Sequence, residues 1–441
     1  MSLRAPEKIR KLQTTLHAKA KESSSYRFYS LYDKLYREDI LEYAYRCCKA
    51  NGGAPGVDGE DFAEIEAYGR EKWLGELAKE LHAKTYQPNA IRRVYIPKPD
   101  GGERPLGIPT VRDRVAQTAA VVLLSPIFEA DLPEEQYAYR EGRNAHEAIK
   151  KVHGLVNSGH TEIVDADLSG YFDSIPHVEL MKSVARRISD RWMLKVIKAW
   201  LTMAVEETDE HGRPRRSNPA RRTKRGIPQG SPISPLLSNL YMRRFILSWK
   251  QLGYEAVLQA YIVNYADDFV ICCRETAAEA MQKMRSIMER LKLTVNERKT
   301  RLRRLPNEQV EFLGYSIGRC FNRKTGKTYL GTYPAKERVK RVCRKISVMT
   351  CARTEQWPVE ERVAALNRVL QGWANYFCLG PVSPAYRAID KHTQARLRQW
   401  LRRKHKLGST GIARFPAKYL YDTLGLVKLE LRTRNFPWAK A

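Results

Sequence analysis

The chain has 441 residues, enough to bury a large core and to divide into two or three domains. It carries 78 Lys and Arg against 49 Asp and Glu, and this net charge of +29 favours a polyanionic partner such as nucleic acid. Its apolar runs are too short, or too interrupted by polar and acidic residues, to span a bilayer, so we expect a soluble protein without a membrane partner; attraction of the basic surface to anionic headgroups is a minor alternative.

The N-terminal region divides into a polar arm and a helix. Residues 1–25 are basic and Ser-rich with weak apolar periodicity, which predicts a loosely held arm. Apolar residues then recur at helical spacing from Leu31 to Cys48, and Asn51, Gly52 and Gly53 end this pattern. We therefore expect the fold to begin after the arm.

The next element is a predicted β-hairpin. Arg92–Pro97 and Arg104–Pro109 read as strands, and Asp100-Gly-Gly102 between them supplies the turn. The prolines of these segments cannot donate ladder hydrogen bonds, so we expect the hairpin at a sheet edge.

Helices and strands interleave irregularly along the rest of the chain. Helical spacing covers residues 111–130, 142–158, 177–204 and 275–292. Strand patterns cover residues 161–168, 257–265, 269–273 and 310–317. Because even βαβ spacing is absent, we expect an α+β fold with antiparallel strands, and an almost purely helical second domain from about Pro334. Residues 321–441 hold 26 basic and 7 acidic residues, which makes this region a candidate phosphate-binding surface.

Two acidic motifs carry the chemistry. Asp267 and Asp268 stand at the tip of a predicted tight hairpin between two apolar strands. An Asp-Asp pair in a turn is usually only turn chemistry, but Asp167 also ends an apolar strand one hundred residues upstream. Three such carboxylates could hold two Mg²⁺ ions for an in-line phosphoryl transfer. Asp165 shares a strand face with Asp167, because side chains alternate along a strand. We expect Asp165 either to support the metal ligands without binding the metal or to lie at the surface.

The segment Arg225-Gly-Ile-Pro-Gln-Gly-Ser-Pro-Ile-Ser-Pro-Leu-Leu-Ser-Asn239, taken with the acidic motifs, resembles the reverse transcriptases of group II introns. The segment Leu370–Phe377 resembles their maturase region, and the whole resemblance runs from the Asn51 loop to about Trp438. It implies a right-hand polymerase, with fingers and an antiparallel palm sheet plus helices, followed by an all-helical thumb/maturase domain. The implied divisions are a basic arm (1–30), fingers and palm with an N-terminal extension (31–330), the thumb/maturase (X) domain (331–405) and a basic segment (406–441).

The resemblance also implies a metal centre. Asp167, Asp267 and Asp268 look like the catalytic, metal-binding aspartates, with the backbone carbonyl of Leu168 completing the shell. The implied cofactor is a pair of Mg²⁺ ions, with Mn²⁺ able to substitute.

Substrate contacts are implied in the same way. Phe172 is equally an ordinary core aromatic or, by resemblance, the side chain that excludes a ribose 2′ hydroxyl. The residues that look like nucleotide ligands are Lys98, Arg104, Phe172, Gln229 and Lys299. Those that look like template and primer contacts are Gly230, Tyr265, Ala266, Phe312, Leu313 and Gly314. A dense basic run suited to RNA phosphates comprises Arg396, Arg398, Arg402, Arg403 and Lys404.

The sequence departs from the family pattern in Gln136–Arg143 and at Ser231, and we expect these changes to alter template-side details rather than activity. It also lacks the Cys and His spacing of an HNH nuclease, so we expect no endonuclease activity and priming from a nascent strand or another available 3′ end.

The resemblance implies an RNA-directed DNA polymerase of the bacterial cytoplasm and nucleoid that acts as a maturase in splicing and supports retrohoming. Its expected partners are intron RNA, an RNA template with a DNA primer, target DNA and dNTPs. The alternatives are a splicing-only RNA-binding maturase, a reverse transcriptase repurposed for defence or repair, and an RNA-templated RNA polymerase.

Overall fold

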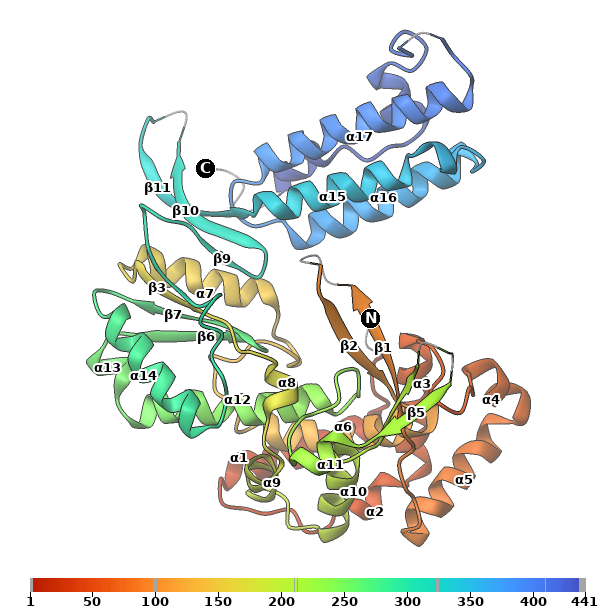
Figure 1. Ribbon diagram of the computed structural model, residues 1–441, viewed down its shortest axis with the longest axis vertical. Coiled ribbons are helices and arrows are strands. Elements are labelled where there is room, and N and C mark those ends of the chain that lie inside the picture. Colours follow the sequence, from red (N-terminus) through yellow and green to blue (C-terminus); the bar gives the residue numbers. More distant parts are fainter. Residues whose placement is uncertain are drawn as a thin grey trace.

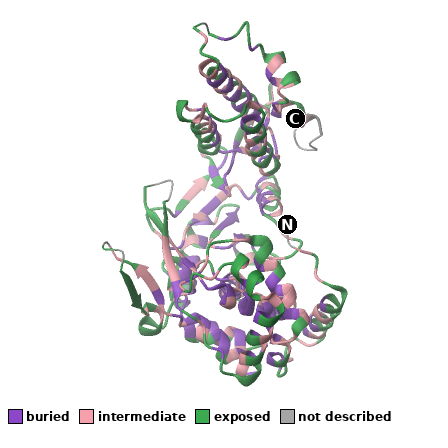
Figure 2. Ribbon diagram, turned by 90° about the vertical axis from the view of Figure 1, so that its right-hand side faces the viewer, coloured by how far each residue is buried: buried purple, intermediate pink, exposed green. Residues whose placement is uncertain are grey.

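The computed structural model describes residues 3–97, 101–209, 211, 213–322, 325–408 and 410–435. A larger part of helices and sheets carries a helical arm, which lies above the β1–β2 hairpin in the view of Figure 1. Buried residues fill the interior of the larger part and run along the inside of the arm (Figure 2). The α+β class and the helical C-terminal region are both confirmed. Among the described residues, no helix is both long and apolar enough to cross a membrane.

The N-terminal part is helical. Its helices are α1 (Glu7–Glu22), α2 (Tyr32–Leu35), α3 (Glu38–Asn51), α4 (Phe62–Tyr68), α5 (Arg70–Ala83) and α6 (Val111–Glu129). The expectation of a loosely held arm at residues 1–25 is wrong, because α1 buries Ile9, Leu16 and Ala20 and packs against α6. These three apolar residues are spaced widely among charges, so the amphipathic pattern is weak although the buried face is continuous.

The predicted hairpin belongs to a four-stranded sheet. Its strands are β1 (Ile91–Pro97), β2 (Glu103–Ile108), β4 (Val205–Thr208) and β5 (Pro214–Ser217), in the order β2-β1-β4-β5. β1 and β2 pair antiparallel as expected. Of these two hairpin strands, however, only β2 lies at a sheet edge, because β1 also pairs with β4.

A second sheet forms the centre of the larger part. Its strands are β6 (Tyr261–Tyr265), β7 (Asp268–Cys273), β3 (Glu162–Ala166) and β8 (Arg301–Arg304), in the order β6-β7-β3-β8 and all antiparallel. The helices in this stretch of the chain are α7 (Ala145–Asn157), α8 (Tyr171–Ser174), α9 (His177–Ala185), α10 (Arg191–Leu201), α11 (Pro219–Thr223), α12 (Ser234–Gln251), α13 (Tyr254–Val257) and α14 (Ala277–Arg290). Of these, α7 and α14 pack against the strands of the sheet. Ile163 packs with α7 and its neighbour Val164 with the core on the α14 side, so the sheet is buried on both faces.

Two predicted boundaries in this region differ from the structure. The helix expected at 177–204 is two helices, because Asp190 caps α10 and accepts hydrogen bonds from Trp192 N (3.0 Å) and Met193 N (3.2 Å). The strand expected from 257 begins only at Tyr261, since residues 254–257 form α13.

The helical arm follows a third sheet. The strands are β9 (Val310–Phe312), β10 (Tyr315–Phe321) and β11 (Thr328–Pro334), in the order β11-β10-β9. The helices beyond are α15 (Lys336–Met349), η1 (Ala352–Thr354), α16 (Val359–Tyr376), α17 (Ser383–Lys404), η2 (Tyr419–Thr423) and η3 (Leu429–Asn435). The arm has its own core, centred on Leu366, Tyr386 and Trp400. The exact divisions at 30, 330 and 405 remain predictions.

Candidate active site

Two of the three candidate aspartates are brought together by strand pairing. In the antiparallel pair of β3 and β7, Ala166 lies opposite Phe269. Asp167 and Asp268 are the next residues beyond this last pair, and the charge of Asp167 acts on Asp268. Tyr265 pairs with Asp268 at the end of β6 and β7, so Ala266 and Asp267 form the connecting turn. All three carboxylates therefore stand at one end of the central sheet.

The turn is held by a residue that we did not single out from the sequence. Asn264 is fully buried, and its side-chain amide donates to the carbonyl of Ala266 (2.8 Å) and, more weakly, to that of Asp268 (3.4 Å). Ala266 has φ of 59°, a left-handed conformation that costs a non-glycine residue about 1–2 kcal/mol. Asn264 thus ties down a turn whose backbone is strained.

Electrostatic repulsion marks this end of the sheet. The Asp268 side chain is exposed at the groove, yet partial desolvation by the surrounding protein, together with the charges of Asp267, Asp167 and Asp165, raises its pKa to about 6 against the opposing charge of Lys299. The pKa of Asp165 is also raised to about 6, mainly by burial and in part by the charge of Asp167, while Arg303 opposes the rise. A cation placed among these carboxylates would relieve the repulsion.

Oxygen donors of this kind suit a divalent metal, so the residues fit one by chemistry and charge. As they stand, the side chains do not converge on one point, since no three His, Cys, Asp or Glu within the described residues are grouped closely enough to hold an ion.

The carboxylate of Asp167 is occupied by neighbouring side chains. Asn296 Nδ2 donates to Asp167 Oδ2 at 2.9 Å, and Lys299 Nζ lies 3.7 Å from the same oxygen. Backbone hydrogen bonds run from Asn296 N to Asp167 O (2.8 Å) and from Ser169 N to Thr294 O (2.9 Å), and in the described part of the chain no backbone N–H donates to the Leu168 carbonyl between them. The structure therefore brings Lys299 to Asp167, together with Asn296, which the sequence analysis missed.

The candidate nucleotide ligands Arg104 and Gln229 lie together. Arg104 Nε donates to Gln229 Oε1 at 3.1 Å, and Gln229 Nε2 is 3.5 Å from Asp173 Oδ2. Burial raises the pKa of Asp173, while Arg93 and Arg104 lower it. Lys98 lies outside the described residues.

Gly230 meets the hairpin rather than open space. Its φ is +106°, and a Cβ built there would lie 2.3 Å from the Gly107 carbonyl oxygen. Gly107 N donates to Gln229 O at 2.7 Å, so strand β2 rests directly on the Gln229-Gly230 segment. The close approach expected of this glycine is to the β1–β2 hairpin.

Phe172 is buried in the main core, with its ring 5.7 Å from that of Tyr171. Its carbonyl accepts from Ile227 N at 2.7 Å, which links it to the Arg225–Asn239 segment. This position is compatible with either expected role, and its part in sugar selection remains a prediction.

The segment Phe312-Leu-Gly-Tyr315, which connects β9 to β10 in the third sheet, contacts the arm. Tyr376 Oη donates to the Leu313 carbonyl at 2.8 Å, and Tyr315 Oη donates to the Tyr376 carbonyl at 2.5 Å. Gly314, with φ of +82°, leaves room for Arg338 and Phe377. The candidate primer contacts therefore pack against the end of the Leu370–Phe377 motif.

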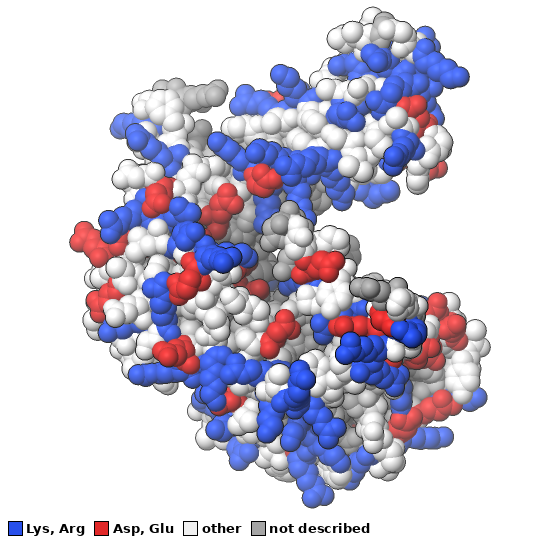
Figure 3. Space-filling model, in the orientation of Figure 1, with Lys and Arg blue, Asp and Glu red and all other residues white. Residues whose placement is uncertain are grey.

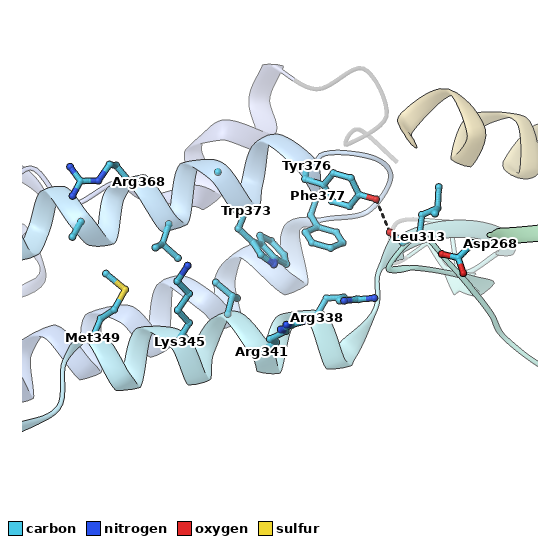
Figure 4. A pocket seen from close by; sticks show the side chains of 14 residues that line it. Asp268, Leu313, Arg338, Arg341, Lys345, Met349, Arg368, Trp373, Tyr376 and Phe377 are labelled. Carbon is cyan, nitrogen blue, oxygen red and sulfur yellow. Dashed lines mark hydrogen bonds between the residues drawn. The ribbon is translucent and has the colours of Figure 1, made fainter. Parts of the chain in front are cut away.

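A groove of about 1130 Å³ runs from Asp268 and Leu313 along α15 and α16. Figure 4 shows the side chains of both helices facing this space, with Tyr376 bonded to Leu313 beside Asp268. Its basic and aromatic lining residues are Arg338, Arg341, Lys345, Arg368, Trp373, Tyr376 and Phe377. Figure 3 shows the molecule hollowed beside α15, with Lys and Arg along that side. These cations recur at helical spacing in the sequence, a signal that could have identified them.

The basic run expected to bind RNA is largely engaged within the arm. Arg396 donates to the Thr350 and Ser347 carbonyls and Arg398 to that of Phe415, while Arg403 pairs with Glu355. Lys404 donates to the carbonyls of Glu355 and Trp357. These contacts secure α17 to its neighbours, and RNA binding by the run, which includes Arg402, remains a prediction.

Comparison with known proteins adds two family matches. Residues 96–317 match the family model described as reverse transcriptase (RNA-dependent DNA polymerase). Residues 339–417 match that of the group II intron maturase-specific domain. The first match contains the three aspartates, and the second contains most of the arm.

Among curated proteins, the chain is 33% identical over 364 residues to protein YkfC of Escherichia coli K12, an alignment that covers 74% of this chain and 92% of YkfC. It is 32% identical over 227 residues to the group II intron-encoded protein LtrA of Lactococcus lactis, which covers 51% of this chain and 36% of LtrA. The match thus spans little more than a third of LtrA. The structure of Candida albicans telomerase with a telomeric RNA fragment aligns with 82% of this chain and 70% of that chain at 14% identity, with a TM-score of 0.43 that is too low to support an inference.

Proposed function

The chain belongs to the group II intron reverse transcriptases that carry a maturase-specific domain, and we propose that it extends a primer 3′ end with dNTPs at Asp167, Asp267 and Asp268. The observation that carries the proposal is the β3–β7 register, which ends at Ala166 opposite Phe269 and so brings the next residues, Asp167 and Asp268, to the same end of the sheet, where Asp268 lines a groove with basic walls.

The family implies a divalent metal. We propose that the three aspartates are the ligands of this metal and that it is a pair of Mg²⁺ ions, for which Mn²⁺ can substitute. Such ions, when bound, stabilise the attacking and leaving oxygens of phosphoryl transfer.

The remaining parts of the site are assigned to binding and orientation. The groove along α15 and α16 takes the template–primer duplex, since four cations on its walls suit phosphates and Leu313 lies beside Asp268. Arg104 and Gln229 receive the incoming nucleotide, because a guanidinium whose hydrogen-bond partner among the described residues is a neutral amide can turn to a triphosphate. Phe172 is assigned to exclusion of the 2′ hydroxyl.

The maturase-specific domain implies that the protein binds intron RNA. That this binding assists splicing, and that the protein supports retrohoming into target DNA, are further parts of the proposal. Similarity to LtrA, named as a group II intron-encoded protein, supports them.

Extension of a DNA primer on an RNA template with dNTPs and Mg²⁺ tests the polymerase assignment. The wild type is compared with the Asp267→Ala, Asp268→Ala double variant. A matched control is Glu360→Ala, Glu361→Ala, which removes two adjacent exposed acids from the start of α16. We expect extension by the wild type and the control only. Extension by the double variant would refute the site, and RNA binding without extension by any protein would favour a splicing-only maturase.

A further inference from the structure

A second groove lies outside the duplex groove and has no role in the proposal above. It is formed by α9, α10 and α11 and has a volume of about 850 Å³. Its apolar lining includes Val178, Met181 and Leu194, of which Val178 is 55% exposed. Apolar side chains exposed in a concave surface are suited to a ligand that brings an apolar face.

The rim of this groove is positively charged. Lys182, Lys198, Arg221 and Lys224 line it, all four are exposed, and no acidic side chain is among its lining residues. The acid that α9 does carry, Glu179, is paired with Lys292 at 2.7 Å. Four cations around one hollow repel each other, and a polyanion would relieve that repulsion.

The positive charge continues beyond the rim. Residues 213–225, which include β5 and α11, contain seven basic residues and no acidic one. Lys and Arg side chains gather over α9, α10 and α11, low in the view of Figure 3. The surface around the groove would therefore attract a chain of phosphates rather than a single anion.

The groove is also connected to the candidate active site through the backbone. His177 N donates to the Lys224 carbonyl (2.9 Å), and His177 Nε2 bonds to the Gly226 carbonyl (2.7 Å), three residues before Gln229. The other side of α11 lines a separate pocket that contains Gln229 and Asp173. A ligand in the α9–α11 groove would thus lie next to the nucleotide side of the site without entering the duplex groove.

We propose that the α9–α11 groove binds a single-stranded segment of RNA, with its phosphates on the four cations and an unstacked base against Val178, Met181 and Leu194. Base faces are apolar and sequence-tolerant partners for such a floor, whereas a duplex keeps its bases stacked inside. The choice of RNA as the polyanion rests on the family's maturase-specific domain, and so on the RNA-binding part of the proposed function.

The test is binding of a fluorescein-labelled 20-nucleotide oligouridylate while the duplex groove is saturated with an unlabelled, chain-terminated template–primer. The groove variant reverses Lys182, Lys198, Arg221 and Lys224 to Glu. A matched control reverses Lys8, Lys79, Arg290 and Arg319, four exposed cations on α1, α5, α14 and β10, and changes the net charge equally. We expect the groove variant to bind at least tenfold more weakly and the control less than threefold.

Three results would overturn the proposal. The first is equal weakening of oligouridylate binding in both variants, which would assign the effect to net charge. The second is unchanged binding by the groove variant. The third is competition by polyglutamate that is as effective as competition by unlabelled RNA.

Acetylation of the wild type provides a readout that does not depend on variant folding, since bound RNA should protect Lys182, Lys198 and Lys224 but not Lys8 or Lys79. Extension of a short template–primer by the groove variant should match the wild type. If no protein extends the primer, the polymerase proposal fails while the binding comparison still decides this one.

Discussion

Asn264 is buried beside the turn that carries Asp267, and its amide is the only side-chain donor that the described residues offer to the Ala266 carbonyl. Replacing it with leucine keeps the number and branching of the side-chain heavy atoms but removes both hydrogen bonds, so the strained turn is free to shift. A shift of about 1 Å at a reacting group can lower a rate about 100-fold. We expect Asn264→Leu to lower kcat for primer extension by about this factor with little change in the KM for dNTP. Asn307→Leu, at an exposed position, is the control, and an unchanged kcat for Asn264→Leu would remove the positioning role.

Gly230 provides a test of the contact between the hairpin and the Gln229 segment. In Gly230→Ala the new Cβ would lie 2.3 Å from the Gly107 carbonyl oxygen, so β2 must move and Arg104 with it. We expect the KM for dNTP to rise at least about tenfold, because the triphosphate ligands lose their arrangement. Gly154→Ala, inside α7 with nothing within 4 Å of the new Cβ, should leave activity unchanged and stabilise the protein by about 0.5–1 kcal/mol. Steady-state primer extension measures the KM for dNTP of both variants, and thermal melting measures their stability.

Among elements, α1 shows how an arm that looks unstructured can be fixed by one buried charge. Arg187 is 1% exposed, donates to the carbonyls of Ser23, Tyr26 and Ala20, and pairs with Asp131 at 3.1 Å. Its replacement by methionine removes the ion pair to Asp131 and the side-chain hydrogen bonds to the Ala20 and Tyr26 carbonyls, and loss of one member of a buried pair costs about 3–5 kcal/mol.

We expect Arg187→Met to lower the melting temperature and to expose residues 23–27 to limited proteolysis. Arg186→Met, at the exposed neighbouring position, should do neither. Equal protease resistance of the two variants would show that α1 is held by other contacts.

The contact between the β9–β11 sheet and the arm is made in part by the hydrogen bonds of tyrosine hydroxyl groups. Tyr376→Phe removes the hydrogen bond to the Leu313 carbonyl, a loss of about 1 kcal/mol. Because Leu313 lines the duplex groove beside Asp268, we expect the KM for template–primer to rise several-fold while the fold persists. Tyr29→Phe, at a position 72% exposed, is the control. An unchanged KM would separate this contact from primer placement.

Elements with strong local signals were predictable. The β1–β2 hairpin, α6, α7 and the strands around Asp167 and Asp268 follow from alternation, helical spacing and turn residues. The prediction of a single helix at 177–204 was wrong because Asp190 was not recognised as a helix cap. The prediction of a loosely held arm in place of α1 was wrong because the apolar residues of α1 are sparse. The first error missed a local capping signal, and the second arises where tertiary contacts outweigh a weak local pattern.

The candidate site was predictable where residues end strands and not where distant segments meet. Two acids at neighbouring strand ends predict their own proximity, as for Asp167 and Asp268. Asn264 and Asn296 act through contacts that no local pattern reveals. The space needed at Gly230 was expected, but not that Gly107 occupies it. The density of the run at 396–404 suggested RNA binding, whereas most of these side chains bond within the arm.

At the scale of the whole molecule, a net charge of +29 makes binding to nucleic acid sensitive to salt. In the duplex groove, Arg341 and Lys345 have no ion-pair partner among the described residues. We expect Arg341→Gln, Lys345→Gln to reduce the slope of log Kd against log salt concentration by about two for an RNA–DNA duplex, because each removed cation would otherwise neutralise about one phosphate. Arg319→Gln, on β10, should leave the slope unchanged. An unaltered slope in the double variant would place the duplex elsewhere.

The central claim is that the aspartates at the head of the groove act in chemistry rather than in binding. It is tested most directly by single-turnover addition of one dNTP to a primer on an RNA template, with the Kd for template–primer measured on the same preparations of wild type and Asp268→Asn. We expect the Kd to agree within about twofold and the rate to fall about a thousandfold or more, because a metal ligand contributes several kcal/mol in the transition state. A rate close to that of the wild type, or a loss explained entirely by weaker binding, would contradict the account.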